Sequence, residues 1–214
     1  MSEGMQKLEM KAHGQPGKLI TFCGLDGCGK TTMISTLEKH LVSLGYEVVV
    51  TKQPTDFVRG MDIFRTFMDE PRHDQYEYRA LSLFAAGDRV QHSNQFVLPH
   101  LRKGRVVISD RYFHCCLANL RARGYKKDQW IYEIVRDIPK PDLAFFLDVD
   151  VELAMKRVRE RQAERDRYID VGLQYRLRQE FLDIAEVNEG VVVSTQGSVE
   201  EAWRDVGKML VECI

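Results

Sequence analysis

No stretch of this 214-residue sequence is apolar for the roughly 18 residues that a membrane-spanning helix needs, and the first 17 residues lack the apolar core of a secretion signal. An excess of one charge is also missing, because 31 Lys and Arg face 32 Asp and Glu. This balance provides no global basic field for nucleic acid or for an anionic membrane. We therefore expect a cytoplasmic protein whose partners are neither nucleic acids nor membranes.

Cysteines at metal-binding or disulfide-forming spacings are missing as well. The five cysteines are odd in number, form no CxxC pair and show no zinc-ligand spacing, which indicates reduced thiols. They are Cys23, Cys28, Cys115, Cys116 and Cys213. The sequence also contains no Ser/Pro-rich linker and no internal repeat, so a single globular domain is predicted.

Five short apolar runs alternate with amphipathic segments from residue 18 onward. The runs are rich in Val, Ile, Leu and Phe, as parallel strands covered on both faces by helices are. The pattern predicts strands over 18–23, 46–51, 105–109, 143–149 and 190–194, and helices over 30–44, 58–69, 75–103, 113–122, 128–137, 151–161, 170–188 and 198–213. It indicates a doubly wound α/β fold with a five-stranded parallel sheet, formed by one domain over 18–214, after a mobile tail over 1–17 that is rich in Gly and Pro near its end.

Residues 24–31 read GLDGCGKT and fit the phosphate-loop motif GxxxxGK[ST], directly after the first predicted strand and at the start of the first helix. Backbone N–H groups of such a loop and the positive end of the helix surround a polyphosphate. We expect Lys30 to reach the β and γ phosphates of ATP, and the Thr31 hydroxyl to bind Mg²⁺. The predicted ATP-binding residues are Gly24, Leu25, Asp26, Gly27, Cys28, Gly29, Lys30, Thr31 and Thr32.

A phosphate loop also occurs in GTPases and motor ATPases, so other segments must separate these classes. The guanine-reading motif Asn/Thr-Lys-x-Asp is missing, and the third strand ends VVISDRY rather than in two acidic residues. Asp110 follows a buried strand at the edge of the sheet where ligands bind. It is suited to hold Mg²⁺ or to orient an acceptor phosphate, and Arg111 is suited to grip that phosphate with two hydrogen bonds. A strand-end salt bridge is the structural alternative.

An arginine-rich segment over 156–167 holds six basic residues and three acidic ones. Arg157, Arg161 and Arg165 share a face if the helix continues, because they lie four residues apart. Arginines on a closing flap neutralise the charge of a transferred phosphoryl group. The alternative is a solvated, salt-bridged helix, but in a phosphate-loop protein we expect a lid over about 157–170.

Several ordered motifs resemble the thymidylate kinase family, which phosphorylates dTMP with ATP. They are FCGLDGCGKTT (22–32), TKQP (51–54), LFAAGDRVQH (83–92), GRVVISDRY (104–112), KPDLAFFLDV (140–149) and the lid (157–167). The resemblance implies a P-loop NTPase fold and a homodimer packed through long helices. It also implies that Asp26 faces the acceptor sugar, that Arg89 contacts the base, and that Arg111, with Tyr112 beside it, binds the acceptor phosphate. The catalytic arginines then come from the lid, as Arg157, Arg161 and Arg167, and Lys30 and Asp110 complete the catalytic set.

The acceptor-facing segments depart from the family pattern. TKQPTD replaces TREPGG, which moves the expected phosphate contacts to Arg59 or Arg65. The base-stacking Phe84 precedes Arg89 by five residues instead of four, so either the helix bulges or Ala85 takes the stacking position. Residues 113–124 replace the usual segment after DRY. These changes leave the acceptor base open.

The leading hypothesis is an ATP- and Mg²⁺-dependent kinase for a nucleoside monophosphate, with dTMP as the first choice. One alternative is a phosphate-loop kinase for another small acceptor, and the other is a nucleotide-binding regulatory protein that has lost turnover. We do not expect His92 or His114 to act as bases, because phosphoryl transfer to a phosphate needs positioning rather than proton abstraction. Cys115 and Cys116 are expected to pack as small apolar residues, and Cys28 is the expected reactive thiol.

Overall fold

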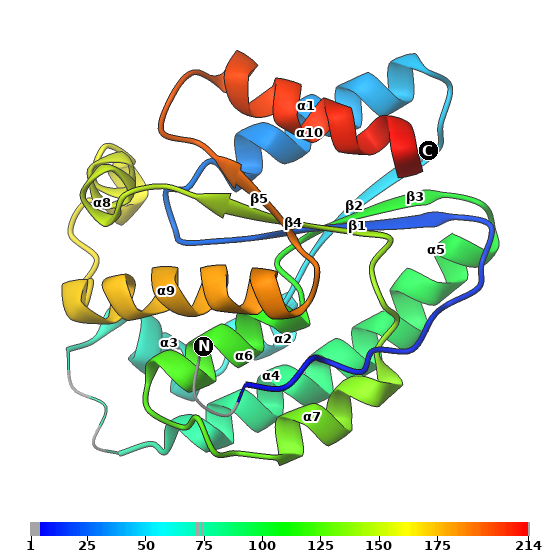
Figure 1. Cartoon of the computed structure of the whole chain (residues 1–214). Coiled ribbons are helices and arrows are strands. Elements are labelled where there is room, and N and C mark those ends of the chain that lie inside the picture. Colours follow the sequence, from blue (N-terminus) through cyan, green and yellow to red (C-terminus); the bar gives the residue numbers. More distant parts are fainter. Residues whose placement is uncertain (1–4, 72, 74, 214) are drawn as a thin grey trace.

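The computed structural model describes residues 5–71, 73 and 75–213. Five parallel strands form one sheet in the order β2-β3-β1-β4-β5 (Figure 1). The strands are β1 (Lys18–Cys23), β2 (Val48–Lys52), β3 (Val106–Asp110), β4 (Leu143–Asp148) and β5 (Val191–Ser194). Each agrees with a predicted strand to within two residues at either end. Because β1 sits between β3 and β4, the carboxyl ends of these three strands lie side by side at the edge of the sheet where ligands bind in this architecture.

Burial follows strand position within the sheet. In the central strand β1, Leu19, Ile20 and Phe22 are completely buried, and Phe22 stacks on Phe145 of β4. The edge strands β2 and β5 are only partly covered, with Val50 and Val192 exposed. The expectation of coverage on both faces therefore holds for the centre of the sheet and not for its edges.

Helices cover both faces of the sheet, as predicted (Figure 1). One face carries α1 (Lys30–Ser43) and α10 (Val199–Cys213). The opposite face carries the larger layer, with α4 (Tyr78–His92), α5 (Leu98–Arg102), α6 (Phe113–Ala122), α7 (Trp130–Ile134) and α9 (Val171–Val187). The short helices α2 (Asp56–Arg59) and α3 (Asp62–Asp69) precede α4, and α8 (Val151–Arg159) follows β4. Within the described residues, no helix has the length and apolar composition required to cross a membrane.

Two long predicted helices are divided in the structure. The segment 58–69 forms α2 and α3, which are separated at Gly60 and Met61. The segment 75–103 forms α4, a π-helical turn over Ser93–Val97 and α5. Pro99 stands in the first turn of α5, where the missing backbone N–H of proline is tolerated.

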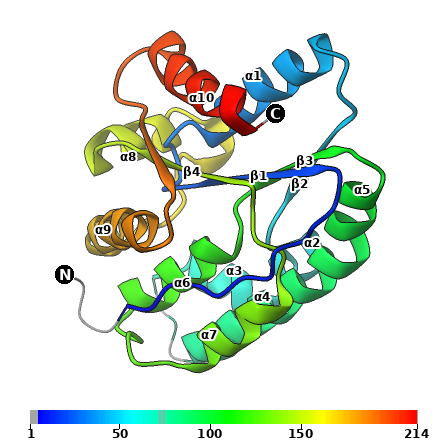
Figure 2. The same cartoon turned by 45° about the vertical axis from the view of Figure 1, so that its right-hand side comes forward.

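The N-terminal segment differs from the mobile tail predicted for 1–17, of which residues 1–4 lie outside the described residues. Residues 5–17 run along the larger helical layer before they enter β1 (Figure 2). The side chain of Leu8 is 5% exposed within the core, and its backbone N–H donates to Asn188 Oδ1 at 2.8 Å. Lys11 exchanges backbone hydrogen bonds with Ile138 and Lys140. The structure therefore packs residues 5–17 against the domain, in contrast to the separate tail that was expected there.

Candidate active site

A cavity of about 560 Å³ lies at the carboxyl ends of β1 and β3. Its wall combines the phosphate loop, the segment of α2 and α3, one face of α4, the start of α6, the loop after α8 and the start of α9. Its volume is within the range of small-molecule sites. One space therefore connects the predicted ATP side to the predicted acceptor side.

Glycine backbone geometry shapes the phosphate loop between β1 and α1. Gly27 has a φ of 83°, and a Cβ there would lie 2.1 Å from the Ala154 carbonyl oxygen of α8. Gly24, with a φ of 137°, leaves no room either, because a Cβ would lie 2.5 Å from the Leu147 carbonyl oxygen. The loop therefore leaves no room for a side chain at Gly27.

Lys30 is the first residue of α1 and is almost completely buried in the loop. Its ammonium donates to the carbonyl oxygens of Leu25 at 2.7 Å and Gly24 at 3.1 Å. The ammonium is thus held inside the loop, and its contact with ATP phosphates stays a prediction. Of the nine predicted ATP-binding residues, all line the cavity except Cys28, which is buried beneath the loop, and Thr32, which is exposed on α1.

Asp26 joins the phosphate loop to two arginines from distant parts of the chain. Its Oδ1 accepts a hydrogen bond from Arg111 Nη2, and its Oδ2 accepts one from Arg167 Nη2 at 2.8 Å. Burial alone would raise the pKa of this carboxyl, but the charges of Arg111, Lys30 and Arg167 outweigh it and hold the pKa far below its usual range. Asp26 is therefore a permanent carboxylate with two guanidinium partners.

Arg111 holds this position with a left-handed backbone, at a φ of 68°. Non-glycine residues in this region cost about 1–2 kcal/mol. Its backbone N–H donates to the Phe22 carbonyl oxygen, and its Nη1 donates to that of Gly24 at 3.3 Å. The strained residue is thus fixed from two sides and lines the cavity, and its role as an acceptor-phosphate ligand stays a prediction.

Thr31 and Asp110, the predicted metal ligands, both line the cavity. Asp110 Oδ1 is buried and has no hydrogen-bond partner, which fits a carboxylate arranged to bind a cation. Among the described residues, no group of three or more His, Cys, Asp or Glu side chains could hold a metal by itself. This donor set fits Mg²⁺, which typically takes one or two protein ligands and completes its shell with substrate phosphates and water.

Basic side chains gather on the acceptor side of the cavity. Arg59 lines it and is held by a 2.7 Å hydrogen bond from Nε to the Pro54 carbonyl oxygen. Burial, together with nearby positive charge that includes Arg111, lowers the pKa of Arg59. Lys52 also lines the cavity, and its pKa is lowered by burial and by Arg59. Lys52 lies in the TKQPTD segment but was not selected from the sequence. Of the two arginines that were selected, Arg59 lies within the cavity wall and Arg65 stands at its rim, largely exposed.

The base-reading residues are only partly where the resemblance placed them. Arg89 is buried, lines the cavity and donates from Nη1 to the Ala85 carbonyl oxygen at 2.8 Å. Helix α4 is regular from Tyr78 to His92, so no bulge lies between Phe84 and Arg89. Phe84 is 50% exposed and does not line the cavity, whereas Ala85 does. The prediction that Phe84 binds the acceptor is therefore wrong, and the extra residue in the motif gives that position to Ala85.

Tyr112 is a second correction. Its side chain is completely buried, and its hydroxyl donates to the Pro139 carbonyl oxygen at 2.7 Å. It does not line the cavity, since residue 112 precedes α6 with an extended backbone that turns the ring into the core. Tyr112 supports the site through its backbone, because its carbonyl oxygen accepts a 3.4 Å hydrogen bond from Arg89 Nε.

Several residues that the sequence reasoning did not select complete the far end of the cavity. Tyr78 packs edge-on against Phe67 and lies under the guanidinium of Arg123, whose Cζ is 4.0 Å from the ring centroid. Asn119 Oδ1 accepts a 2.8 Å hydrogen bond from Arg123 Nη1. Asn119 and Arg123 belong to the unusual segment after DRY, which was the available signal that this end differs from the family pattern.

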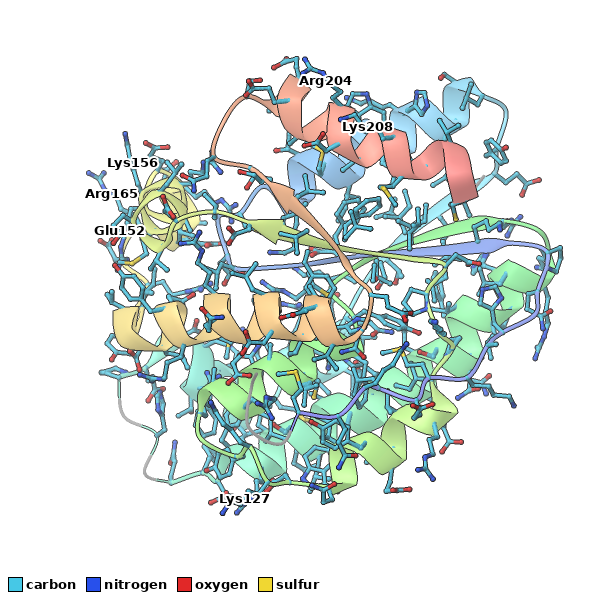
Figure 3. The ribbon with its side chains drawn as sticks, viewed as in Figure 1. Lys127, Glu152, Lys156, Arg165, Arg204 and Lys208 are labelled. Atoms are coloured by element: carbon cyan, nitrogen blue, oxygen red, sulfur yellow. The ribbon has the colours of Figure 1, made fainter. Side chains whose placement is uncertain are left out.

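The lid arginines separate into three groups. Arg167 is bound to Asp26, and Arg161 lines the cavity beside Glu164, with an N–O distance of 3.5 Å. Arg157 does not line the cavity, because its Nη2 donates to the Thr195 carbonyl oxygen at 2.9 Å. Helix α8 ends at Arg159, so the expected helical face shared by Arg157 and Arg161 does not form and the structure does not place Arg157 as a catalytic residue. Figure 3 shows Lys156 and Arg165 at the outer side of this region, where both side chains are exposed.

His92 and His114 lie outside the cavity, whereas His73 is among its lining residues. His92 is hydrogen-bonded to Thr51 at 2.8 Å and Gln53 at 3.0 Å. His114 is buried against Phe146. The expectation that neither of them acts as a base stays a prediction.

The family model described as thymidylate kinase matches residues 22–206. A probable thymidylate kinase of Thermococcus gammatolerans is 35% identical over 89% of this chain and 94% of its own length, and one of Pyrococcus horikoshii is 36% identical over the same shares. A thymidylate kinase of Sulfurihydrogenibium sp. is 32% identical over 92% of this chain and 97% of its own. With the phosphate loop, the DRY segment and the lid arginine converging on one cavity, these matches show that the chain belongs to the thymidylate kinase family.

Proposed function

We propose that this protein transfers the γ-phosphoryl group of ATP to dTMP, with Mg²⁺, and releases dTDP and ADP. The observation that carries the proposal is the continuity of the cavity between the phosphate loop and the basic group formed by Lys52, Arg59 and Arg111. A donor triphosphate and an acceptor monophosphate require positive charge at both places, and phosphoryl transfer depends on positioning and charge neutralisation. Family membership supplies dTMP as the first acceptor.

On the ATP side, the glycine loop and Lys30 hold the phosphates. Thr31 and Asp110 would hold Mg²⁺, which neutralises charge on the β and γ phosphates when it is bound. Lys30→Ala should weaken ATP binding strongly, because the ammonium is buried within the loop. A titration of the variant with ATP checks this, and undiminished affinity would remove Lys30 from the site.

On the acceptor side, Arg111 and Arg59 grip the phosphate. Asp26 lies beside Arg111 and faces the sugar, and the base lies against the Ala85 face of α4. Arg111→Ala should raise the KM for dTMP far more than the KM for ATP. Equal effects on the two KM values would place Arg111 elsewhere.

Acceptor choice separates the proposal from its two alternatives. An ADP-release assay across dTMP, dUMP, UMP, CMP and dGMP should give the highest kcat/KM with dTMP. Preference for another acceptor would support a kinase of different specificity. The altered segment with Asn119 and Arg123 is the reason to consider this alternative. Tight ATP binding without acceptor-stimulated turnover would support a regulatory protein.

We infer further that the protein is a homodimer. Phe57 of α2 is 74% exposed, and Leu83 and Phe84 of the neighbouring α4 are about half exposed. Exposed apolar side chains on adjacent helices are typical of a subunit interface, and the resemblance implies pairing through long helices. Light scattering should give a dimer mass for the native protein and a monomer mass for Phe84→Glu, while a monomeric native protein would contradict the inference. The cytoplasmic location stays a prediction that cell fractionation would test.

A further inference from the structure

Two adjacent cysteines line the cavity at the start of helix α6, on the acceptor side. Cys115 and Cys116 are the third and fourth residues of this ten-residue helix, and both side chains contribute to the cavity wall although little of their surface is exposed. Cys23 ends β1 and lies next to Cys115 in the core. A small molecule that enters the cavity therefore meets thiols that bulk solvent barely reaches.

Cys115 lies in a positively charged environment. Arg111 is four residues before it, and Arg89 reaches the same turn through its hydrogen bond to the Tyr112 carbonyl oxygen. The first turn of a helix adds the partial positive charge of its free N–H groups. Burial alone would raise the pKa of the Cys115 thiol, but a hydrogen bond from the Cys23 thiol and the charges of Arg111 and Arg89 outweigh it and lower this pKa.

The other thiols lack a place in the cavity wall, a lowered pKa, or both. The Cys116 thiol donates to the Ser82 carbonyl oxygen at 3.8 Å, and burial raises its pKa. Cys28 is completely buried and does not line the cavity. Cys213 is the most exposed of the five, but burial still raises its pKa. Surface exposure alone would therefore predict Cys213 as the reactive thiol. Position in the cavity wall and nearby positive charge favour Cys115 instead.

We propose that Cys115 is a covalent modification site inside the acceptor cavity, and that it reacts with small alkylating agents and small disulfides. With iodoacetamide, the thiolate sulfur forms a bond to the methylene carbon as the carbon–iodine bond breaks and iodide leaves. With a small disulfide, the thiolate attacks one sulfur, the sulfur–sulfur bond breaks, and the other half leaves as a thiolate. The adduct occupies space beside Arg111 and blocks the acceptor. This last consequence rests on the proposed function, whereas the modification itself does not.

The pH dependence of labelling tests the site. The native protein is treated with iodoacetamide between pH 6 and 8, and the rate at each cysteine is followed by peptide mass spectrometry. A thiol that is already ionised reacts at a nearly constant rate, whereas a thiol below its pKa gains about tenfold per pH unit. We expect the Cys213 rate to rise about 100-fold across this range, because its pKa is raised, and the Cys115 rate to rise at least tenfold less, because its pKa is lowered.

This slope does not depend on how easily the reagent enters the cavity. A Cys115 rate that rises in parallel with that of Cys213, or no labelling of Cys115, would overturn the proposal.

Variants and ligand protection complete the test. Cys115→Ser should keep its own starting activity after treatment, whereas Cys116→Ser, the matched control, should lose activity as the native protein does. Equal loss in both variants would overturn the assignment to Cys115. Added dTMP should slow labelling of Cys115 and leave Cys213 unaffected; labelling of Cys115 without protection would confirm the modification site and contradict the acceptor placement.

Discussion

Arg167 donates from Nη2 to Oδ2 of Asp26 at 2.8 Å and so joins the lid to the phosphate loop across 141 positions of the sequence. The second carboxylate oxygen of Asp26 binds Arg111 from the acceptor side. One carboxylate thus sets the separation of two guanidinium groups that come from different elements. The segment around Arg167 is thereby held against the phosphate loop.

We predict that Arg167→Ala lowers kcat by about 10²- to 10³-fold, the effect of removing one preorganised donor to a developing charge. The KM for ATP should change little, because the loop and Lys30 hold the ATP phosphates independently of Arg167. Steady-state kinetics with varied ATP at saturating dTMP measure both constants.

Arg165→Ala is the matched control for this variant. Arg165 is an exposed arginine of the same loop, and its side chain does not line the cavity. Its kcat should remain within about twofold of the native value, as is typical of exposed sites without partners. A comparable loss in the two variants would show that net lid charge, rather than the position of Arg167, governs the rate.

Most of the fold could be predicted from the sequence because its signals are local. Continuous apolar runs and the phosphate-loop motif located every strand and the start of α1. The N-terminal segment was not predictable, because Leu8 is fixed by Asn188, which lies 180 positions away. The sequence predicted the presence of helices better than the residues at which they end, as the division at Gly60 and Met61 shows.

The site was predictable where a residue belongs to a motif with fixed backbone geometry, as Lys30 and Arg111 do. It was not predictable where a side chain depends on the exact end of a helix. Arg157 and Arg161 do not share a helix face, because α8 ends at Arg159. In α4, one extra residue before Arg89 places Ala85 rather than Phe84 in the cavity wall. Cys115 packs in the core, as was expected of a small apolar residue, but its charged environment could not be predicted because it arises only in the folded chain.

The phosphate loop gives a prediction about stability. Gly27→Ala should destabilise the protein by more than Gly29→Ala. Both glycines have positive φ, which costs an alanine about 1 kcal/mol. Only at Gly27 would the new Cβ also meet a backbone atom, the Ala154 carbonyl oxygen. Urea unfolding without nucleotide measures both free energies, and equal losses would show that the contact with α8 relaxes freely.

A buried ion pair links α6 to α9. Arg121 Nε donates to Glu180 Oε2 at 2.7 Å, and both side chains are almost completely buried. We predict that Glu180→Ala lowers the free energy of unfolding by about 3–5 kcal/mol, because it leaves an uncompensated buried guanidinium. Urea unfolding at pH 7 measures this loss.

An exposed pair provides the control for this prediction. Glu133→Ala breaks a surface contact with Arg136 of 3.1 Å and should cost at most about 1 kcal/mol. The double variant Arg121→Met/Glu180→Leu should recover much of the loss, because apolar residues of similar size need no compensation in the core. If the double variant recovers none of the lost free energy of unfolding, the ion pair itself stabilises the fold, beyond the cost of leaving one charge buried alone.

His114 gives the protein a pH-dependent stability. Burial lowers the pKa of this histidine to about 4, whereas the unfolded chain binds a proton near pH 6.5. Between these values the unfolded state holds more protons, so the free energy of unfolding should fall as pH decreases from about 6.5 to 4. The full difference corresponds to about 3 kcal/mol. His114→Gln should flatten this part of the profile, as measured by urea unfolding at several pH values. His40→Gln, at an exposed position of α1, should keep the native slope; a native slope in His114→Gln would assign the effect to another group, because a glutamine cannot take up the proton that drives it.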